Sequence, residues 1–194
     1  MRRSARPAAP AVIENGDRWN ERWEAAEDQK PRRQFQLVRS QNRTVRDWIR
    51  DDLAAMTQEH CAHSSRYTVE PESVRHFRPK SDPRFLDLAY AWENLFFCCG
   101  GCQSHKLEQW DDSLINPDAP DYTFERYFRF EFTTGEIKPN PKASQSDQHA
   151  ARTTIEIYGL DSPQRRRWRR LEAERWRESR NLPLDLFAYR DFIA

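Results

Sequence analysis

The sequence lacks any long apolar run, and this absence excludes the usual ways in which a chain enters a membrane. No stretch of the 194 residues approaches the roughly 18 apolar residues that a membrane-spanning helix requires. The opening residues, MRRSARPAAPAVIENGD, are basic, but they have no apolar core of the kind found in a secretory signal peptide. We therefore expect a cytoplasmic protein that does not associate with membranes.

An excess of one charge sign is also missing. The chain has 32 Lys and Arg residues against 31 Asp and Glu residues, which gives a formal net charge of +1. Because bulk attraction to a polyanion is thereby excluded, any polyanion-binding site must come from local segregation of charge. Hydrophobic residues make up 37% of the chain, which predicts a modest core and a part of the chain that lies on a partner. Aromatic residues are plentiful and argue against overall disorder.

Cysteine is scarce and confined to one segment. All four cysteines and four of the five histidines fall between positions 60 and 105, which identifies this segment as the chemical centre of the chain. In a reducing compartment, these cysteines are expected to be thiols or metal ligands and not disulfides. The cluster consists of Cys61, Cys98, Cys99, Cys102, His60, His63, His76 and His105.

Hydrophobic periodicity predicts helices on both sides of this centre. One helix is expected within residues 42–59, capped by Thr44, because its apolar residues recur on one helical face. A second is expected over residues 147–158 and ends at Gly159. Ser162 and Pro163 open a third, which runs to residue 180. A short helix is also expected within residues 17–30.

The strands are expected within the Cys- and His-rich segment, residues 60–105, and just after it. Residues 67–77 and 86–92 predict two strands, and residues 103–110 predict a helix after the Cys99-Gly-Gly-Cys102 turn. Residues 124–132 alternate well and predict a hairpin with residues 136–138 across a Thr-Thr-Gly turn. The apolar residues 182–194 are expected to dock on the body of the protein.

The Cys99-x-x-Cys102 spacing is typical of a zinc knuckle, because two sulfurs three residues apart can bind one tetrahedral ion. Such a site needs a second ligand pair, and Cys61 is its obvious first member. The residue three positions later is Ser64, a poor zinc ligand, so His63 or His60 is the candidate fourth ligand. Three interpretations stay open: a Cys3His zinc site, a site that has lost its ion, and a set of buried thiols. Redox chemistry is disfavoured because the βαβ context that it requires is absent.

The stretch SVRHFRPKSD surrounds His76 with cations. Arg75, Arg78 and Lys80 would disfavour the protonated imidazole, and all three are candidate nucleic-acid contacts that would hold phosphate groups by charge. Lys106 is a further candidate phosphate contact. A neutral imidazole of this kind could act as a base beside a phosphate. The alternative is that His76 is a structural residue, buried and satisfied by a hydrogen bond.

Arginines crowd the helix expected after residue 162. It is either a solvated amphipathic helix, with arginines paired to Glu172, Glu174 and Glu178, or a surface that contacts phosphates or an acidic partner. The phosphate-contacting candidates are Arg166, Arg169 and Arg170.

Five motifs follow one another in an order that resembles a known family. They are VRHFRPKSD, LAYAWENLFFCCGGCQSHK, SLINPD, FxFxxxGEI and ARTTIEIYGLDSPQRRRWRR. This series resembles the HNH endonucleases of Septu and retron-associated antiphage systems (PtuB-like proteins), from about residue 45 to about residue 170.

The resemblance implies an α+β fold, with a ββα-metal (HNH) finger embedded in a mostly helical small domain. From the resemblance and the residue patterns on either side of it, the expected organisation is a partly mobile arm and short helix over residues 1–30, an HNH core with a β-hairpin over 31–140, and an Arg-rich helical segment over 141–194. His76 is implied to be the general base and Asn94 the central asparagine. Cys61, Cys99 and Cys102 are the implied metal ligands, and His63 is the candidate that would complete them as the fourth ligand.

The resemblance also implies cofactors and partners. They are a structural Zn²⁺, a catalytic Mg²⁺ or Mn²⁺, an ABC-type ATPase (PtuA-like), a DNA or RNA substrate, and a retron reverse transcriptase with its nucleic acid. Three residues depart from the family pattern: Arg75 replaces the usual acid, Gln103 an Asn or His, and Ser64 a cysteine. An alternative is therefore a degenerate HNH scaffold that binds nucleic acid or a partner protein without cleaving.

Overall fold

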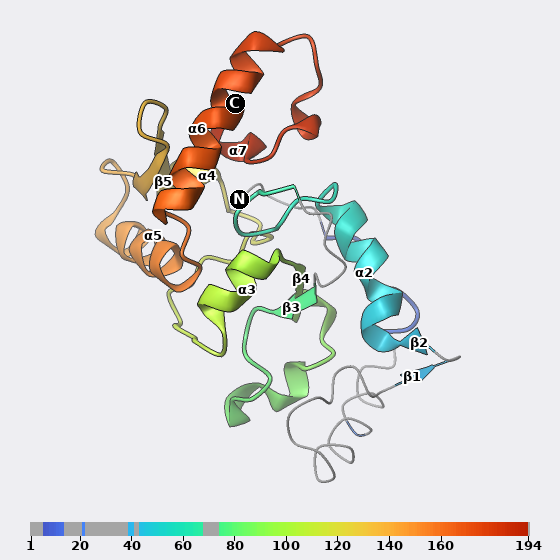
Figure 1. Cartoon of the computed structure of the whole chain (residues 1–194). Coiled ribbons are helices and arrows are strands. Elements are labelled where there is room, and N and C mark those ends of the chain that lie inside the picture. The colour runs from blue at the N-terminus through green and yellow to red at the C-terminus, as the bar shows by residue number, and fades with distance from the viewer. Residues whose placement is uncertain (1–5, 14–20, 22–38, 41–42, 68–73, 194) are drawn as a thin grey trace.

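The chain has an α+β architecture, seen here in a computed structural model that describes residues 6–13, 21, 39–40, 43–67 and 74–193 (Figure 1). Within these residues the strands pair as three separate two-stranded antiparallel sheets. No helix in this part of the chain is both long and apolar enough to cross a membrane. The elements are β1 (Arg39–Ser40), β2 (Arg43–Thr44), α2 (Val45–Met56), β3 (Val74–His76), η2 (Pro83–Leu88), η3 (Trp92–Asn94), β4 (Leu95–Phe97), α3 (Gly100–Lys106), α4 (Phe124–Tyr127), β5 (Phe128–Glu131), β6 (Glu136–Pro139), α5 (Gln145–Ile157), α6 (Pro163–Glu178), η4 (Leu184–Leu186) and α7 (Arg190–Ile193).

Helix α2 begins where its sequence predicts. The Thr44 hydroxyl accepts a hydrogen bond from the backbone N–H of Asp47, whose carboxylate in turn accepts one from the backbone N–H of Thr44. This reciprocal capping satisfies two amide groups that the helix itself leaves unpaired. The fully buried Ile49 and Leu53 turn toward β3 and β4, so α2 covers one side of the central strands.

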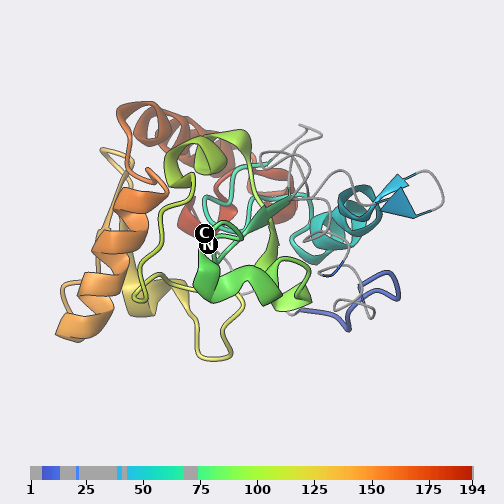
Figure 2. The same cartoon turned by 90° about the horizontal axis from the view of Figure 1, so that it is seen from below.

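The central unit consists of β3, β4 and α3. In the antiparallel pair, Val74 lies opposite Phe97 and His76 lies opposite Leu95. Helix α3 follows β4 after two residues, and Figures 1 and 2 show the unit between α2 on one side and α5 on the other. The unit therefore has the order strand, strand, helix.

The expectation of a strand over residues 86–92 is wrong. Asp82 caps a 3₁₀ turn that opens with Pro83, and this turn and η3 occupy most of residues 83–94. The second strand instead uses Leu95–Phe97, all three of which are buried. A fully buried strand is a continuous apolar run and not an alternation, so the alternation rule points to the wrong residues here.

The β5–β6 hairpin forms as predicted, but it is shorter. Thr123 caps a single helical turn, α4, by accepting a hydrogen bond from the backbone N–H of Arg126, so Phe124–Tyr127 do not join the strand. Gly135 closes the hairpin with a φ of 74°, and a Cβ atom there would lie 2.1 Å from the backbone oxygen of Arg166. Glycine at this position thus lets the hairpin approach α6.

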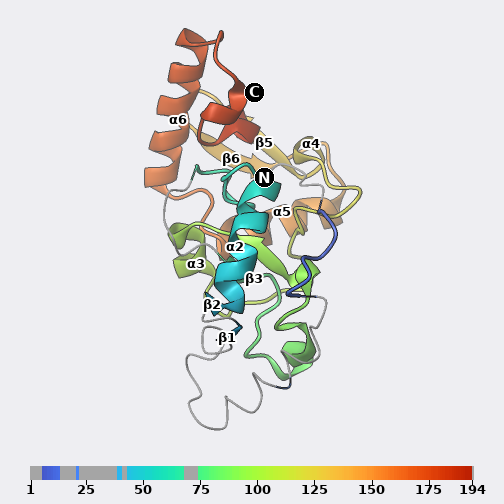
Figure 3. The same cartoon turned by 90° about the vertical axis from the view of Figure 1, so that its right-hand side faces the viewer.

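The C-terminal helices fold back over the hairpin, as expected for the apolar tail. Figure 3 shows α6 and α7 beside β5 and β6. Phe187, Tyr189, Phe192 and Ile193 are all buried in the larger of the two apolar clusters. The same cluster contains all four cysteines, so the tail and the chemical centre share one core.

Part of the expected N-terminal arm packs on the central unit. The Arg6 guanidinium pairs with Asp118, donates hydrogen bonds to the backbone oxygens of Trp92 and Leu95, and lies 4.6 Å from the ring centre of Phe96. Residues 1–5, 14–20 and 22–30 of the expected arm and short helix lie outside the described residues.

Candidate functional site

His76 stands at the end of β3, and its ring is fixed by a backbone carbonyl. The Nε2 atom lies 2.8 Å from the oxygen of Ala89. Because a carbonyl oxygen can only accept, Nε2 carries the proton and Nδ1 carries the basic lone pair of the neutral ring. The residue is 8% exposed, so the imidazole is buried at the edge of the central unit.

The ring of His76 is neutral because it is buried. Burial is the first cause that lowers its pKa to about 3, and Lys80 and Arg75 lower the pKa further by charge. The sequence predicts the cationic contribution, but it does not predict that loss of solvation would outweigh the cations.

Asn94 pins the connection between the two strands. Its Oδ1 atom accepts a 2.7 Å hydrogen bond from the backbone N–H of Arg78, and its Nδ2 atom donates to the backbone oxygens of Arg78 and Leu88. The side chain is buried, so these three bonds replace the water that it loses on folding. Asn94 therefore sets the shape of the loop beside His76, and its role in this structure is a positioning one.

Arg75 points away from the ring of the adjacent His76. Its Nη2 atom donates to the backbone oxygen of Leu107 and pairs with Glu108 at 3.2 Å. A carboxylate at this position could bind a cation, whereas a guanidinium cannot. Among the described residues, the single cluster of three or more His, Cys, Asp or Glu side chains near enough to share an ion is elsewhere, at the cysteines.

An exposed arginine and two aromatic rings form a surface beside the His76 loop. The Arg78 guanidinium lies 5.7 Å from the ring centres of both Phe85 and Trp110, whose rings meet edge to face at 5.3 Å. We call Arg78, Phe85 and Trp110 the aromatic shelf. A guanidinium on aromatic faces beside an open surface suits a phosphate with a neighbouring base.

The two predicted lysine contacts differ in their surroundings. Lys80 is half-buried near His76. Lys106 is fully buried, donates a 3.0 Å hydrogen bond to the backbone oxygen of Gln109, and has a pKa lowered to about 8 by burial. The structure therefore does not place its ammonium group on the surface, where a phosphate would meet it.

Three cysteines come together as the sequence predicts. The sulfurs of Cys61, Cys99 and Cys102 all lie within 4.8 Å of one another and are buried. We call these three residues the thiol cluster. The Ser64 hydroxyl lies 3.5 Å from the sulfur of Cys99, and the Ser64 backbone N–H lies 3.5 Å from that of Cys61. Ser64 thus faces the cluster from the position where a fourth cysteine is expected.

Neither candidate histidine completes the thiol cluster in the described structure. The His63 ring stacks on Tyr158 with a centroid distance of 4.0 Å, and burial lowers its pKa to about 3. The ring nitrogens of His60 lie 2.6 Å and 3.0 Å from the backbone oxygens of Gln58 and Phe187. Both rings are therefore used in packing the surrounding chain.

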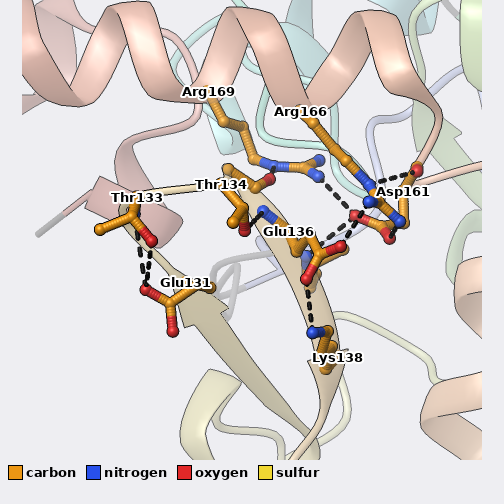
Figure 4. Close-up of polar contacts among 10 residues, drawn as sticks. Glu131, Thr133, Thr134, Glu136, Lys138, Asp161, Arg166 and Arg169 are labelled. Carbon is orange, nitrogen blue, oxygen red and sulfur yellow. Dashed lines mark hydrogen bonds and ion pairs between the residues drawn. The ribbon is translucent and has the colours of Figure 1, made fainter.

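The arginines of α6 divide into structural and exposed groups, and Figure 4 shows the polar contacts of Arg166 and Arg169. Arg169 is buried and donates to the backbone oxygens of Gly135 and Leu160 and to Asp161. Arg166 pairs with Glu136 and Asp161, whereas Arg170 is exposed and lies 4.0 Å from Glu174. Of the three predicted phosphate contacts on this helix, Arg170 is therefore the one on an open surface.

Several contacts escape a reading of the sequence. The contact of His76 with the Ala89 oxygen cannot be predicted, because a backbone oxygen has no side-chain pattern that would identify it. The contact of Arg165 with Cys102 depends on how α6 packs against α3 in the folded chain. Trp110 follows a polar stretch that contains Lys106, and it is partly buried against the core. Arg6 lies more than 80 residues from its partners Trp92 and Leu95.

Comparison with known proteins supports the motif reading. No protein-family model matches the chain. The chain is similar to a protein of Vibrio cholerae serotype O1 biovar El Tor that is described as "Retron Vc95 putative HNH endonuclease". The two are 27% identical over 138 residues, which is 68% of this chain and 66% of that protein, so the chain spans just under two thirds of its curated relative. This similarity supports a likeness to HNH endonucleases as a broad group.

Proposed function

We propose that the protein is an HNH-type endonuclease that hydrolyses phosphodiester bonds in nucleic acid. The observation that carries this proposal is a neutral histidine at the end of the first strand of a strand–strand–helix unit, with its Nε2 proton held by the Ala89 oxygen. The ordered sequence motifs and the similarity to a retron-encoded relative support the same reaction class. In this proposal the central unit is the HNH finger.

In the proposed reaction, His76 accepts a proton from the attacking water at its Nδ1 atom while the water oxygen bonds to phosphorus, the P–O bond to one nucleoside oxygen breaks, and that leaving oxygen takes a proton from solvent water. A neutral imidazole can accept a proton, whereas an imidazolium cannot, and in the proposed complex the anionic phosphate raises the basicity of the ring above that of the free protein, where burial lowers its pKa to about 3. Asn94 keeps the loop shaped so that the ring stays against Ala89. The aromatic shelf holds the strand next to the reacting phosphate, with Arg78 as the charged contact.

The two metals implied by the resemblance fit this structure differently. Three buried sulfurs within 4.8 Å suit a structural Zn²⁺, which would join the loop of Cys61 to the start of α3 when bound. The described residues near His76 do not offer a comparable set of ligands for Mg²⁺ or Mn²⁺. Arg75 occupies the position at which an Asp or Glu carboxylate would bind such an ion, and a guanidinium cannot bind a cation. We therefore assign no step of the reaction to that ion.

The proposed setting is bacterial defence against phage, with an ABC-type ATPase as partner and a retron reverse transcriptase with its nucleic acid as a further one. The order of the motifs and the retron origin of the relative support this setting. A complex that co-purifies when the chain and the ATPase of its own gene neighbourhood are expressed together is the expected result.

Incubation of the purified full chain with labelled plasmid, single-stranded DNA or RNA tests the activity. Each substrate is supplied with Mg²⁺ or Mn²⁺, with and without the ATPase. We expect wild type and His149→Gln, which changes an exposed histidine on α5, to cleave at least one substrate equally. His76→Ala is expected to leave it intact, and equal cleavage by His76→Ala would remove His76 from the role of base.

A second candidate function is a scaffold that binds nucleic acid without cutting it. The position of Arg75, paired with Glu108 and the Leu107 carbonyl, favours it, because the site then lacks an acidic ligand. Restoring the acid in Arg75→Glu separates the two functions. An inert wild type and a variant that gains metal-dependent cleavage support the scaffold, whereas a wild type that already cleaves rejects it.

A further inference from the structure

One arginine of α6 is buried against the thiol cluster. The Nη2 atom of Arg165 lies 3.3 Å from the sulfur of Cys102, and the residue is 7% exposed. Its Nη1 atom is also buried and has no hydrogen-bond acceptor among the described residues. A guanidinium is always charged and keeps five N–H donors, so this burial requires a negative partner nearby.

The chain around the thiol cluster leaves room for this guanidinium. A Cβ atom at position 101 would lie 3.1 Å from the Nη2 atom of Arg165, a close contact that glycine avoids. Gly101 lies between Cys99 and Cys102 in the first turn of α3, so the approach of Arg165 depends on the residue inside the cysteine motif.

We propose that Arg165 is the outer charge partner of a zinc ion bound by Cys61, Cys99 and Cys102, and that it makes the buried site electrically neutral. Zinc binds the thiolate form, so three cysteines and one divalent ion together carry one net negative charge. The guanidinium contributes the single positive charge that cancels it. With Ser64 as a neutral group on the fourth side, the charges sum to zero without a fourth cysteine.

The remaining cysteine takes no part in this charge balance. The thiol of Cys98 lies in contact with Cys61 and Cys102, but it also donates toward the backbone oxygen of Cys99 at 3.8 Å. A thiol that donates to a carbonyl keeps its proton and is not a thiolate ligand. Cys98 therefore serves as a neutral neighbour of the site and as a matched control for its ligands.

The proposed zinc site also explains how α6 is held. Arg165 and Arg169 lie one turn apart on the same face of this helix, and both are buried. Arg169 joins α6 to the hairpin, and Arg165 joins it to the thiol cluster. The metal would thus lock the Arg-rich helix onto the central unit, independently of whether the protein cleaves nucleic acid.

Zinc affinity of the full chain, measured by competition with a chromogenic chelator, tests the inference. Wild type is expected to bind one zinc per chain, and Arg165→Met to bind it about 10- to 100-fold more weakly. Arg170→Met, on the exposed side of the same helix, is expected to match wild type. Unchanged affinity in Arg165→Met, or a wild type that binds no zinc when it is supplied, would overturn the proposal.

Two further measurements distinguish a charge partner from a general packing residue. Because the buried guanidinium lies 3.3 Å from the Cys102 sulfur, Arg165→Met is expected to lower the melting temperature more when zinc is bound than in the metal-free chain. A decrease of equal size in both states would contradict the inference.

The absorbance of the cobalt-substituted protein tests which cysteines bind the metal. Sulfur-to-metal charge-transfer absorbance is expected to fall in Cys99→Ser and to persist in Cys98→Ser. A loss in Cys98→Ser would show that Cys98 is a fourth thiolate ligand, which would reject the proposed neutral site.

Discussion

The two polar residues at the centre are each held by backbone atoms. His76 binds the carbonyl of Ala89, and Asn94 binds both backbone groups of Arg78. The sequence predicts that these two residues matter, because each stands in a recognisable motif. It cannot predict their partners, since a backbone carbonyl is present at every position and only the folded loop selects one.

Replacing Asn94 should destabilise the protein through its loop. Asn94→Asp removes both Nδ2 donors, leaves the carbonyls of Arg78 and Leu88 unsatisfied, and buries a charge. We expect a decrease of about 2–4 kcal/mol in the free energy of unfolding, measured with urea. Asn181→Asp, at an exposed position, serves as control and should change stability by less than about 0.5 kcal/mol. Similar effects of the two changes would contradict the role of Asn94.

His76 should make stability depend on pH. Its pKa is about 3 in the folded chain and near 6.5 in the unfolded chain, so between these values the unfolded state binds more protons. The stability is therefore complete above pH 6.5 and is lost as pH falls toward 3. We expect wild type to lose about 2 kcal/mol from this group between pH 7 and pH 5.

The variant His76→Gln keeps an N–H donor but removes the titrating ring, so its unfolding free energy should vary less over the same pH range. His149→Gln changes an exposed histidine and should keep the wild-type dependence. Urea unfolding at several pH values compares the three chains. A variant curve parallel to that of wild type would show that the ring of His76 is not buried as a neutral group.

At the scale of elements, the sequence predicts helices better than strands. Thr44 marks the start of α2 directly and Gly159 marks the end of α5, whereas the capping residue Ser144 is missed and α5 begins at Gln145, two residues before the expected start. The strands are short and fully or partly buried, so alternation misplaces β4 and extends β5 into α4. The Arg-rich helix was expected to be either solvated or phosphate-binding, but Arg165 and Arg169 instead dock it, because contact with the hairpin and α3 decides which side is buried.

Arg169 should be the main attachment of α6 to the hairpin. Arg169→Met removes three hydrogen bonds and leaves Gly135 and Leu160 carbonyls without this donor. We expect a decrease of about 3 kcal/mol in the free energy of unfolding and faster amide hydrogen exchange in α6. Arg170→Met should leave both quantities close to wild type. Unchanged exchange in α6 of the Arg169 variant would contradict the attachment.

At the scale of the whole molecule, distant segments meet at the central unit. The tail buries Phe187 and Phe192 in the core that contains the cysteines, and Arg6 reaches the carbonyls on both sides of Asn94. The sequence predicts docking of the tail from its apolar residues. It does not predict docking by Arg6, because an arginine in a segment rich in Ala, Pro and Arg gives the same sequence pattern whether it is solvated or buried.

The rate of phosphodiester cleavage under single-turnover conditions tests the central claim most directly. The substrate is the nucleic acid that the full chain cleaves best, and the chains compared are wild type, His76→Ala and His149→Gln. If the neutral imidazole of His76 takes the proton from water, the His76 variant should be slower by about 10²- to 10⁴-fold, with the His149 variant unchanged. Equal rates for all three chains would contradict the claim.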